Sequence, residues 1–242
     1  MAEIIHVLDH KVQLYQPQNG FRTSFDSVML AAASKHKTGD VVVDLGSGVG
    51  GALFCAAFRV PDAQYIGIER EAEYFELAQK NRELNPFAKK VEFIRADIFD
   101  YVASFEKPFA DAILMNPPFY NENFTSSPDI LKQSAKGFCE DSNLEGWLKV
   151  AHKILKSKGH LMLIFPSFGL DVILKFLHQK FGEIEILPLQ SKAHTESKRV
   201  IVRARKDRHA PLKILPAFIV HEEDGRYTKK ADEILRDGKA LF

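Results

Sequence analysis

The sequence contains only two cysteines, Cys55 and Cys139, which are too few and too far apart for a disulfide framework or a zinc-binding motif. It has no apolar run of the roughly 18 to 20 residues that cross a bilayer, and no basic-then-apolar secretion signal. Low-complexity segments and internal repeats of solenoid length are absent as well. We therefore expect reduced thiols, no metal site, no membrane contact and a cytoplasmic protein.

Neither sign of charge prevails, because 33 Lys and Arg residues are balanced by 32 Asp and Glu residues. The overall charge therefore gives no indication of a nucleic-acid partner, and only its local distribution can do so. With 45% hydrophobic and 27% charged residues, the composition is that of an ordinary globular protein. A chain of 242 residues has room for one α/β domain with short appendages, but not for two separate cores.

Short apolar runs rich in β-branched residues alternate with longer stretches of helical periodicity. This alternation predicts an α/β fold with a mostly parallel, seven-stranded sheet and helices on both faces. The predicted strands are Val41 to Leu45, Tyr65 to Glu69, Val91 to Ala96, Ala112 to Met115 and His160 to Phe165, followed by a hairpin of Ile184 to Pro188 with Arg199 to Ala204. The predicted helices between them are Gly51 to Phe58, Glu71 to Leu84, Leu144 to Leu155, which ends before Lys158-Gly159, and Leu170 to Phe181.

The two ends of the chain differ from this core. Residues 1–38 form an N-terminal segment with a short predicted strand, Val12 to Tyr15, and a predicted helix, Ser27 to Lys35, capped by Asp26 or Ser27. Residues 39–206 form the core. Residues 207–242 are expected to be an extension that packs on it and carries a short helix from Lys229 to Arg236.

A glycine-rich turn joins the first core strand to the following helix, in the run Asp44-Leu45-Gly46-Ser47-Gly48-Val49-Gly50-Gly51. Glycine lets a ligand approach the backbone closely at the end of a strand, where such sheets open a crevice. The spacing of Gly46, Gly48 and Gly51 also fits a dinucleotide-binding loop, which is the alternative interpretation. Asp44 argues against it, because a carboxylate there would repel a pyrophosphate but can accept from the amino group of a methionine moiety.

Acidic residues also end the next two strands. Glu69 can accept hydrogen bonds from both hydroxyls of a ribose, and Asp97 and Ile98 can contact an adenine amino group and ring. Either kind of cofactor would use Glu69, so that residue does not discriminate between them. Capping a helix or facing water is the commoner role of such acids. Their placement at successive strand ends nevertheless favours contact with a ligand.

The predicted strand Ala112 to Met115 leads into the turn Asn116-Pro117-Pro118-Phe119. Two successive prolines lack backbone N–H donors, so the carbonyls of this turn have no local amide partner. With the Asn116 side chain, these carbonyls can accept the N–H groups of an exocyclic amine on a conjugated ring, and Phe119 can stack on that ring. The alternative is that the turn only ends a buried strand. Its position downstream of the glycine turn favours the catalytic interpretation.

The series Asp44-x-Gly46-x-Gly48, Glu69, Asp97 and Asn116-Pro117-Pro118-Phe119 resembles the class I S-adenosylmethionine-dependent methyltransferases with an (Asp/Asn)-Pro-Pro-(Tyr/Phe) motif. The resemblance implies a Rossmann-like fold and S-adenosyl-L-methionine as cofactor. It also implies that the target is an exocyclic amine of adenine or guanine, or a glutamine amide.

The N-terminal segment narrows the resemblance. Its residues Gln16-Pro17 to Gly20-Phe21-Arg22, then Asp26 to Ala32, are similar to the start of bacterial tRNA adenine-N6 methyltransferases that act on position 37 of a valine tRNA. This implies that Arg22 and Asp26 lie at the cofactor and that the substrate is tRNA. The sequence departs from the family at Phe21, where Tyr or His is common, and at Phe119, where Tyr is common. The identity of the target base therefore stays open.

Positive charge is concentrated between Lys192 and Lys213, where eight Lys or Arg residues face only Glu196 and Asp207. Strand alternation places Arg199, Arg203 and Arg205 on one side, so this stripe could neutralise RNA phosphates. A solvated edge strand protected by cations is the other explanation. Lys132 and Lys136, in the polar stretch after the Asn-Pro-Pro-Phe turn, could extend the same surface.

The leading hypothesis is an RNA adenine-N6 methyltransferase. The alternatives are a guanine-N2 methyltransferase of rRNA, a protein-glutamine methyltransferase and, from another class, a dinucleotide-dependent oxidoreductase. The chain has no room for the separate docking domain that glutamine methyltransferases carry.

Overall fold

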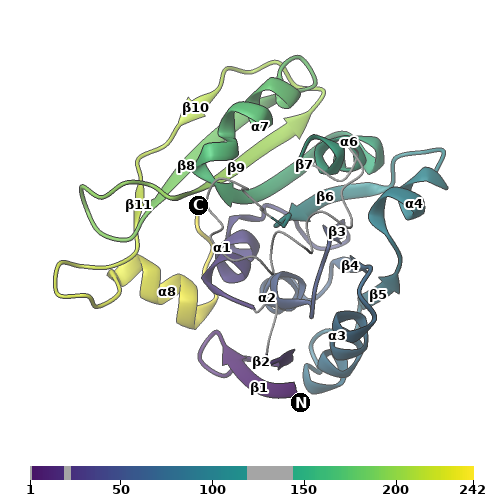
Figure 1. Ribbon diagram of the computed structural model, residues 1–242, viewed down its shortest axis with the longest axis horizontal. Helices are drawn as coiled ribbons and strands as arrows, with labels where there is room; N and C mark the ends of the chain where they lie inside the picture. The colour runs from purple at the N-terminus through teal and green to yellow at the C-terminus, as the bar shows by residue number, and fades with distance from the viewer. Residues whose placement is uncertain (1, 19–22, 119–143) are drawn as a thin grey trace, which may run out of the picture.

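The computed structural model describes residues 2–18, 23–118 and 144–242. The main sheet has nine strands, and Figure 1 shows it running across the middle of the molecule. In order across the sheet the strands are β10 (Lys213–Ile214), β8 (Phe181–Gln190), β9 (Arg199–Lys206), β7 (Leu155–Pro166), β6 (Ala110–Met115), β3 (Val41–Leu45), β4 (Gln64–Glu69) and β5 (Val91–Arg95), while β11 (Phe218–Ile219) also pairs with β8.

The sheet is mostly parallel, as predicted. Strands β3 to β7 pair in parallel, and β9 lies antiparallel between β7 and β8. The seven predicted strands are all present, and the two-residue strands β10 and β11 add to them along the outer edge of β8. Because β9 is flanked on both sides, the interpretation of the basic stretch as an edge strand is wrong. The carboxyl ends of β3, β4, β6 and β7 lie at one edge, which is where ligands bind in such sheets.

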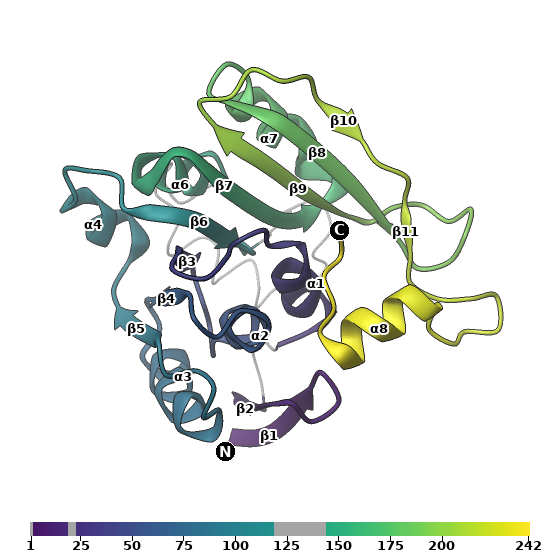
Figure 2. The same cartoon turned by 180° about the vertical axis from the view of Figure 1, so that it is seen from behind.

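Helices cover both faces of the sheet, as Figures 1 and 2 show. One face packs on α1 (Phe25–Ala33), α2 (Gly51–Arg59) and α3 (Ala72–Leu84), and the other on α4 (Ile98–Ala103), α6 (Leu144–Ile154) and α7 (Leu170–Leu177). Successive strand residues alternate between the two cores, so Val42 joins the first and Val43 the second. Among the described helices, none is long and apolar enough to cross a membrane.

A two-stranded hairpin precedes the main domain. Its strands β1 (Ala2–Val7) and β2 (Val12–Pro17) are antiparallel and form a sheet of their own. The second edge of β2 is satisfied by two buried asparagines, Asn81 of α3 and Asn85 directly after it. The Asn85 amide exchanges hydrogen bonds with the N–H and C=O of Gln13 at 3.1 and 2.8 Å, and the Asn81 amide does the same with Tyr15 at 2.6 and 3.0 Å. These amides therefore take the place of a third strand.

The C-terminal residues return to the first helix. Helix α8 (Lys229–Asp237) begins at Thr228, whose side-chain oxygen accepts from the Ala231 N–H, and ends at Gly238 in the left-handed region. Beyond it, the Leu241 N–H donates to the Ala32 carbonyl of α1 at 2.9 Å. Leu241 is buried. Figure 2 shows α8 beside α1.

Three local predictions were wrong: the cap of α1, the end of α6 and the end of α7, which lies at Leu177 because Phe181 begins β8. Helix α1 begins after Ser24, and neither Asp26 nor Ser27 caps it. Helix α6 ends at Ile154 and β7 begins at Leu155, so Lys158-Gly159 lies within a strand instead of ending the helix. The reason is tertiary, because the Lys206 ammonium donates to the carbonyls of His152 and Leu155 at 2.8 and 2.9 Å and ends the helix there. The short helix α4 was not predicted.

Candidate active site

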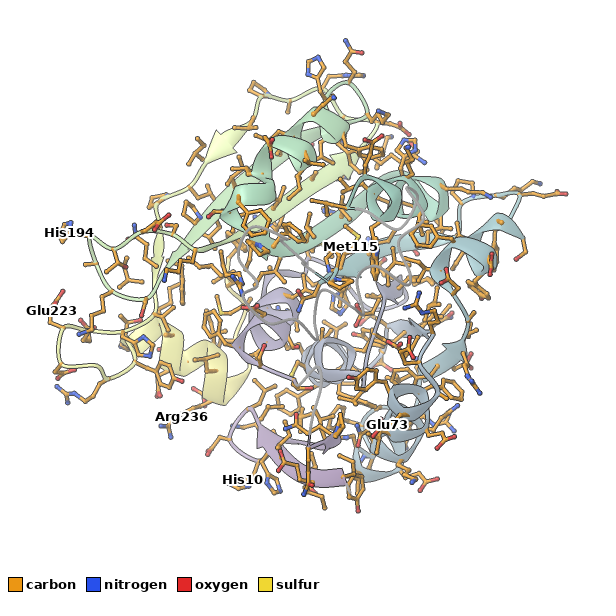
Figure 3. The ribbon with its side chains drawn as sticks, viewed as in Figure 1. His10, Glu73, Met115, His194, Glu223 and Arg236 are labelled. Carbon is orange, nitrogen blue, oxygen red and sulfur yellow. The ribbon has the colours of Figure 1, made fainter. Side chains whose placement is uncertain are left out.

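A small pocket lies at the carboxyl edge of the sheet, where β3 and β6 end. Figure 3 marks Met115, the last residue of β6, near the middle of the molecule. The pocket brings together the end of β3, the glycine turn, the start of α1 and the residue that follows β6. Its polar lining is Thr23, Ser27, Asp44, Ser47 and Asn116.

The glycine turn needs glycine for two separate reasons. Gly46, Gly48 and Gly50 have φ angles of 67°, 55° and 89°, in the left-handed region that residues with a Cβ avoid. At Gly46 a Cβ would also lie 2.5 Å from the Trp147 ring of α6. Gly50, the residue before α2, was not singled out from the sequence, because the dinucleotide spacing drew attention to Gly51 instead.

Glu69 organises this turn from the neighbouring strand. One carboxylate oxygen accepts from the Gly48 N–H at 2.8 Å, and the other accepts from the Glu71 N–H at 2.8 Å. The side chain is buried, and burial raises the pKa of Glu69 although both backbone donors act to lower it. A carboxylate can accept about four hydrogen bonds, so capacity for a ligand hydroxyl remains.

Asp44 is the more isolated of the two acids. It is 3% exposed, and burial together with the negative charge of Glu69 raises its pKa well above the usual range. In the lining of the same pocket, the buried Ser47 hydroxyl has no hydrogen-bond partner among the described residues. A ligand that brings a cationic N–H group to Asp44 and a polar atom to Ser47 would satisfy both.

The sequence predicts that Asp97 and Ile98 follow the third core strand and contact the adenine of the cofactor. The structure places them just after β5. Asp97 caps α4 by accepting from the Phe99 N–H at 2.9 Å, and its other oxygen receives Arg70 at 3.3 Å. Ile98 is buried in the core. Neither lines the small pocket, so the helix-capping alternative describes Asp97 in this structure.

The start of α1 contributes to the pocket in a way that the sequence did not indicate. Thr23 and Ser27 line it, whereas Asp26, the predicted cofactor contact, pairs with Arg199 at 3.2 Å. Arg22, predicted from the family resemblance, lies outside the described residues. The signal that could have identified Ser27 is its position one residue after Asp26, on the buried side of the helix.

Asn116 is half-buried and lies directly after β6 in the pocket lining. Pro117 is buried and Pro118 is exposed, while Phe119 lies outside the described residues. A second aromatic residue, Phe168, follows the carboxyl end of the adjacent strand β7 and is 52% exposed. Sequence reasoning missed it because a phenylalanine after a buried strand usually belongs to the core.

The basic stretch is divided among ion pairs. Arg199 pairs with Asp26, Arg203 with Glu185, and Arg205 with Glu183 at 3.2 Å. Arg203 is 5% exposed, which contradicts its prediction as a surface contact for RNA phosphates. The aliphatic core around β9 and its interior position in the sheet bury the side chain. Lys132, Lys136 and Cys139 lie outside the described residues, whereas Cys55 is a buried free thiol.

Comparison with known proteins gives a consistent result. A family model described as "Methyltransferase domain" matches residues 36–208. A Dyadobacter fermentans protein named tRNA1(Val) (adenine(37)-N6)-methyltransferase is 24% identical over 212 residues, covering 87% of this chain and 86% of the relative. A Porphyromonas gingivalis protein of the same name is 28% identical over 218 residues, covering 86% of this chain and 84% of the relative.

Solved structures agree on the architecture. A predicted O-methyltransferase from Agrobacterium tumefaciens matches with a TM-score of 0.74 and 25% identity, covering 90% of this chain and 98% of that one. The M. jannaschii protein TYW2, solved in complex with AdoMet, matches with a TM-score of 0.58 and 15% identity, covering 86% of this chain and 87% of that one.

Within the residues that the structure describes, no group of three or more His, Cys, Asp or Glu side chains could hold a metal ion.

Proposed function

Because this chain belongs to the methyltransferase-domain family and its cofactor is S-adenosyl-L-methionine, we propose that it methylates the exocyclic N6 of an adenine in tRNA. The observation that carries the proposal is the position of Asn116. It follows β6 in the same small pocket as Asp44 and Gly46, and two prolines come after it. The names of the curated relatives support tRNA as the substrate.

The residues in and around the pocket fit this cofactor. The buried carboxylate of Asp44 would hold the cationic amino group, and Glu69, already oriented by two backbone N–H groups, would receive the ribose hydroxyls. The glycine turn offers backbone without side chains beside them. Asp97 and Ile98, after β5, are proposed contacts of the adenine, with Asp26 and Arg22 near the methionine end.

The cofactor supplies an electrophilic methyl group bound to a sulfonium. The protein's part is to present a weak nucleophile to it. The Asn116 side-chain oxygen and the Pro117 carbonyl would accept the two N–H groups of the adenine amine, which orients its nitrogen and stabilises charge that develops on it. Pro118 lacks the amide N–H that could otherwise occupy a neighbouring carbonyl. Catalysis in this proposal therefore comes from positioning.

An aromatic platform would hold the ring of the target base. Phe119 follows the prolines, and Phe168 is exposed at the end of the strand next to β6. Stacking on an aromatic side chain is worth roughly 1 to 3 kcal/mol per base and tolerates different bases. The platform would thus hold the ring of any base, while Asn116 and Pro117 would select a base that carries an exocyclic amine.

The decisive experiment measures single-turnover methyl transfer to bulk tRNA that lacks the modification, followed by mass analysis of its nucleosides. Asn116→Ala should lower the transfer rate by on the order of a hundred- to a thousandfold and leave cofactor affinity within a fewfold, because Asn116 acts on the transition state. Asn116→Asp should keep partial activity. Gln64→Ala, exposed at the far end of β4, is the matched control.

Two outcomes would contradict the proposal in different ways. Transfer by Asn116→Ala at the wild-type rate would show that the turn only ends a strand. A methylated guanine or a methylated protein glutamine, with no N6-methyladenine, would keep the mechanism but assign another substrate.

A further inference from the structure

A second cavity lies far from the candidate active site, on the same face of the sheet as α1. Its volume is about 300 Å³. Strand β9 connects the two regions, since Arg199 at its start pairs with Asp26 of α1 and Arg205 near its end lines the cavity. At about 3.3 Å per residue, the two ends of this strand segment are roughly 20 Å apart. The cavity is therefore separate from the pocket that holds Asn116.

Neighbouring strands bring the polar lining together. Arg203 of β9 lies opposite Glu185 of β8, and Arg205 lies opposite His160 of β7. These side chains face the side of the sheet that α1 covers, but α1 ends at Ala33. Lys35 follows it and reaches Glu185 at 4.0 Å. Where the apolar cover of α1 stops, polar side chains line the surface.

Positive charge exceeds negative charge in this lining. Lys35, Arg203, Arg205 and Lys213 are opposed by Glu183 and Glu185, which leaves two positive charges in excess. Lys213 has no ion-pair partner among the described residues, and it extends from the edge strand β10. Because opposite charges attract strongly where walls exclude water, this excess favours an anion.

Arg203 gives independent support for a ligand. Its side chain is 6% exposed, and one terminal nitrogen pairs with Glu185. Its Nε and other terminal nitrogen are buried without a hydrogen-bond partner among the described residues. The Phe242 ring covers the guanidinium, with its centroid 3.3 Å from Cζ. Buried donors without acceptors cost roughly 1 to 3 kcal/mol each, so an additional acceptor at this position would stabilise the protein.

We propose that this cavity binds a phosphate group, carried either by a small molecule such as a mononucleotide or by an RNA backbone. A phosphate monoester carries about −1.5 to −2 charges at neutral pH, which matches the excess of positive charge. Its several oxygens suit the lysines and the arginine forks around the cavity. A small shift of the Phe242 ring would open the unpaired donors of Arg203 to it.

The test uses the full chain saturated with S-adenosylhomocysteine, so that no adenine-containing probe enters the cofactor pocket. Inorganic phosphate and AMP are titrated by calorimetry into the wild type and into a Lys35→Gln, Lys213→Gln double variant. Both lysines lie at the surface, so the fold should be kept. Loss of two charge-assisted contacts should weaken binding at least tenfold. Lys229→Gln, an exposed lysine of α8, is the control and should bind like the wild type.

A parallel titration with tRNA identifies the source of the phosphate. If the double variant weakens phosphate and AMP but not tRNA, the ligand is a small molecule. If it weakens tRNA and lowers the salt dependence of tRNA binding, the cavity holds the RNA backbone. Equal affinities of the wild type and the double variant for all three probes would overturn the proposal.

A second readout comes from His160, whose pKa is lowered by burial and by the charges of Arg205, Lys35 and Arg203. Bound phosphate would offset those charges, so the imidazole should titrate at a higher pH in its presence. An unchanged His160 titration at saturating phosphate would place the ligand elsewhere and contradict the proposal.

Discussion

The Nε of Arg199 donates to a carboxylate oxygen of Asp26 across 3.2 Å, and this ion pair joins two segments that lie 173 residues apart. It connects the start of β9 to the first turn of α1. Ser27, the residue after Asp26, lines the small pocket of the candidate active site. The sequence predicts Asp26 as a cofactor contact and Arg199 as a contact for RNA phosphates. Their pairing indicates that one function of Arg199 is to position the start of α1.

Arg199→Gln should therefore weaken binding of S-adenosylhomocysteine by about two- to fivefold, because a partly exposed ion pair contributes about 1 kcal/mol or less. High salt should reduce the difference in cofactor affinity between the variant and the wild type, because salt screens the ion pair. Calorimetry at low and high salt measures both effects. The neighbouring exposed residue Lys198, replaced by Gln, should show no change in cofactor affinity. Equal loss in both variants would point to a general charge effect.

Asp44 should show opposite effects on stability and on binding. Its pKa in the folded protein is raised by burial and by Glu69, so its contribution to stability is present below the unfolded pKa and lost as pH rises. At pH values above the unfolded pKa, the buried acid at position 44 thus destabilises the unliganded protein. Asp44→Asn should raise the melting temperature without cofactor, yet weaken cofactor binding by about ten- to a hundredfold.

Thermal unfolding with and without S-adenosylhomocysteine checks both parts of this prediction. In the wild type, cofactor affinity should also fall as the pH is lowered through the raised pKa of Asp44, because only the carboxylate attracts a cationic amine. A variant that loses stability and retains affinity would exclude Asp44 from the cofactor site.

His36 should make the protein sensitive to mild acid. The neutral ring is held between the Ser34 hydroxyl and the Tyr65 hydroxyl, at 2.6 Å from each, and burial lowers its pKa from 6.5 to about 4. Above pH 6.5 the ring is neutral in both the folded and unfolded states. As the pH falls from 6.5 to about 4, only the unfolded state takes up the proton, so stability declines by up to about 3 kcal/mol.

Urea unfolding between pH 7 and pH 4.5 measures this decline, and His36→Gln provides the reference. The variant is less stable at pH 7, but its stability should fall less steeply with acid, since the titrating ring is gone. The raised pKa values of Asp44 and Glu69 act in the opposite direction and are common to both proteins, so they cancel in the comparison. Parallel pH profiles would show that His36 does not carry the effect.

Asn81 should be important for both folding and the glycine turn. Its amide satisfies the edge of β2 at Tyr15 and also donates to the Val49 carbonyl, within the glycine turn, at 3.0 Å. Asn81→Leu preserves the volume but leaves buried backbone groups unpaired, which should cost about 2 to 4 kcal/mol. Urea unfolding measures the loss, with Glu83→Leu, exposed on the same helix, as control. Equal stability of Asn81→Leu and the wild type would refute this role.

The order of the seven main strands and of every described helix except α4, the glycine turn and the Asn116 turn could be predicted from the sequence. Each depends on residues that are close together in the chain, through alternating or helical periodicity, φ preference and proline chemistry. Glu69 could be predicted to lie near the glycine turn, because a parallel sheet brings the carboxyl ends of its strands to one edge. These features required no knowledge of which strand lies beside which.

The tertiary structure alone decided what the basic stretch does. Alternation places Arg199, Arg203 and Arg205 on one side of a strand, but the insertion of β9 between β7 and β8 determines that Arg203 is buried against Glu185 and Arg199 meets Asp26. Asn81 and Asn85 likewise reveal their function only once β2 lies beside them. The energy of a charged or amide side chain depends on partners brought by the fold from distant parts of the chain, and periodicity along the sequence does not identify those partners.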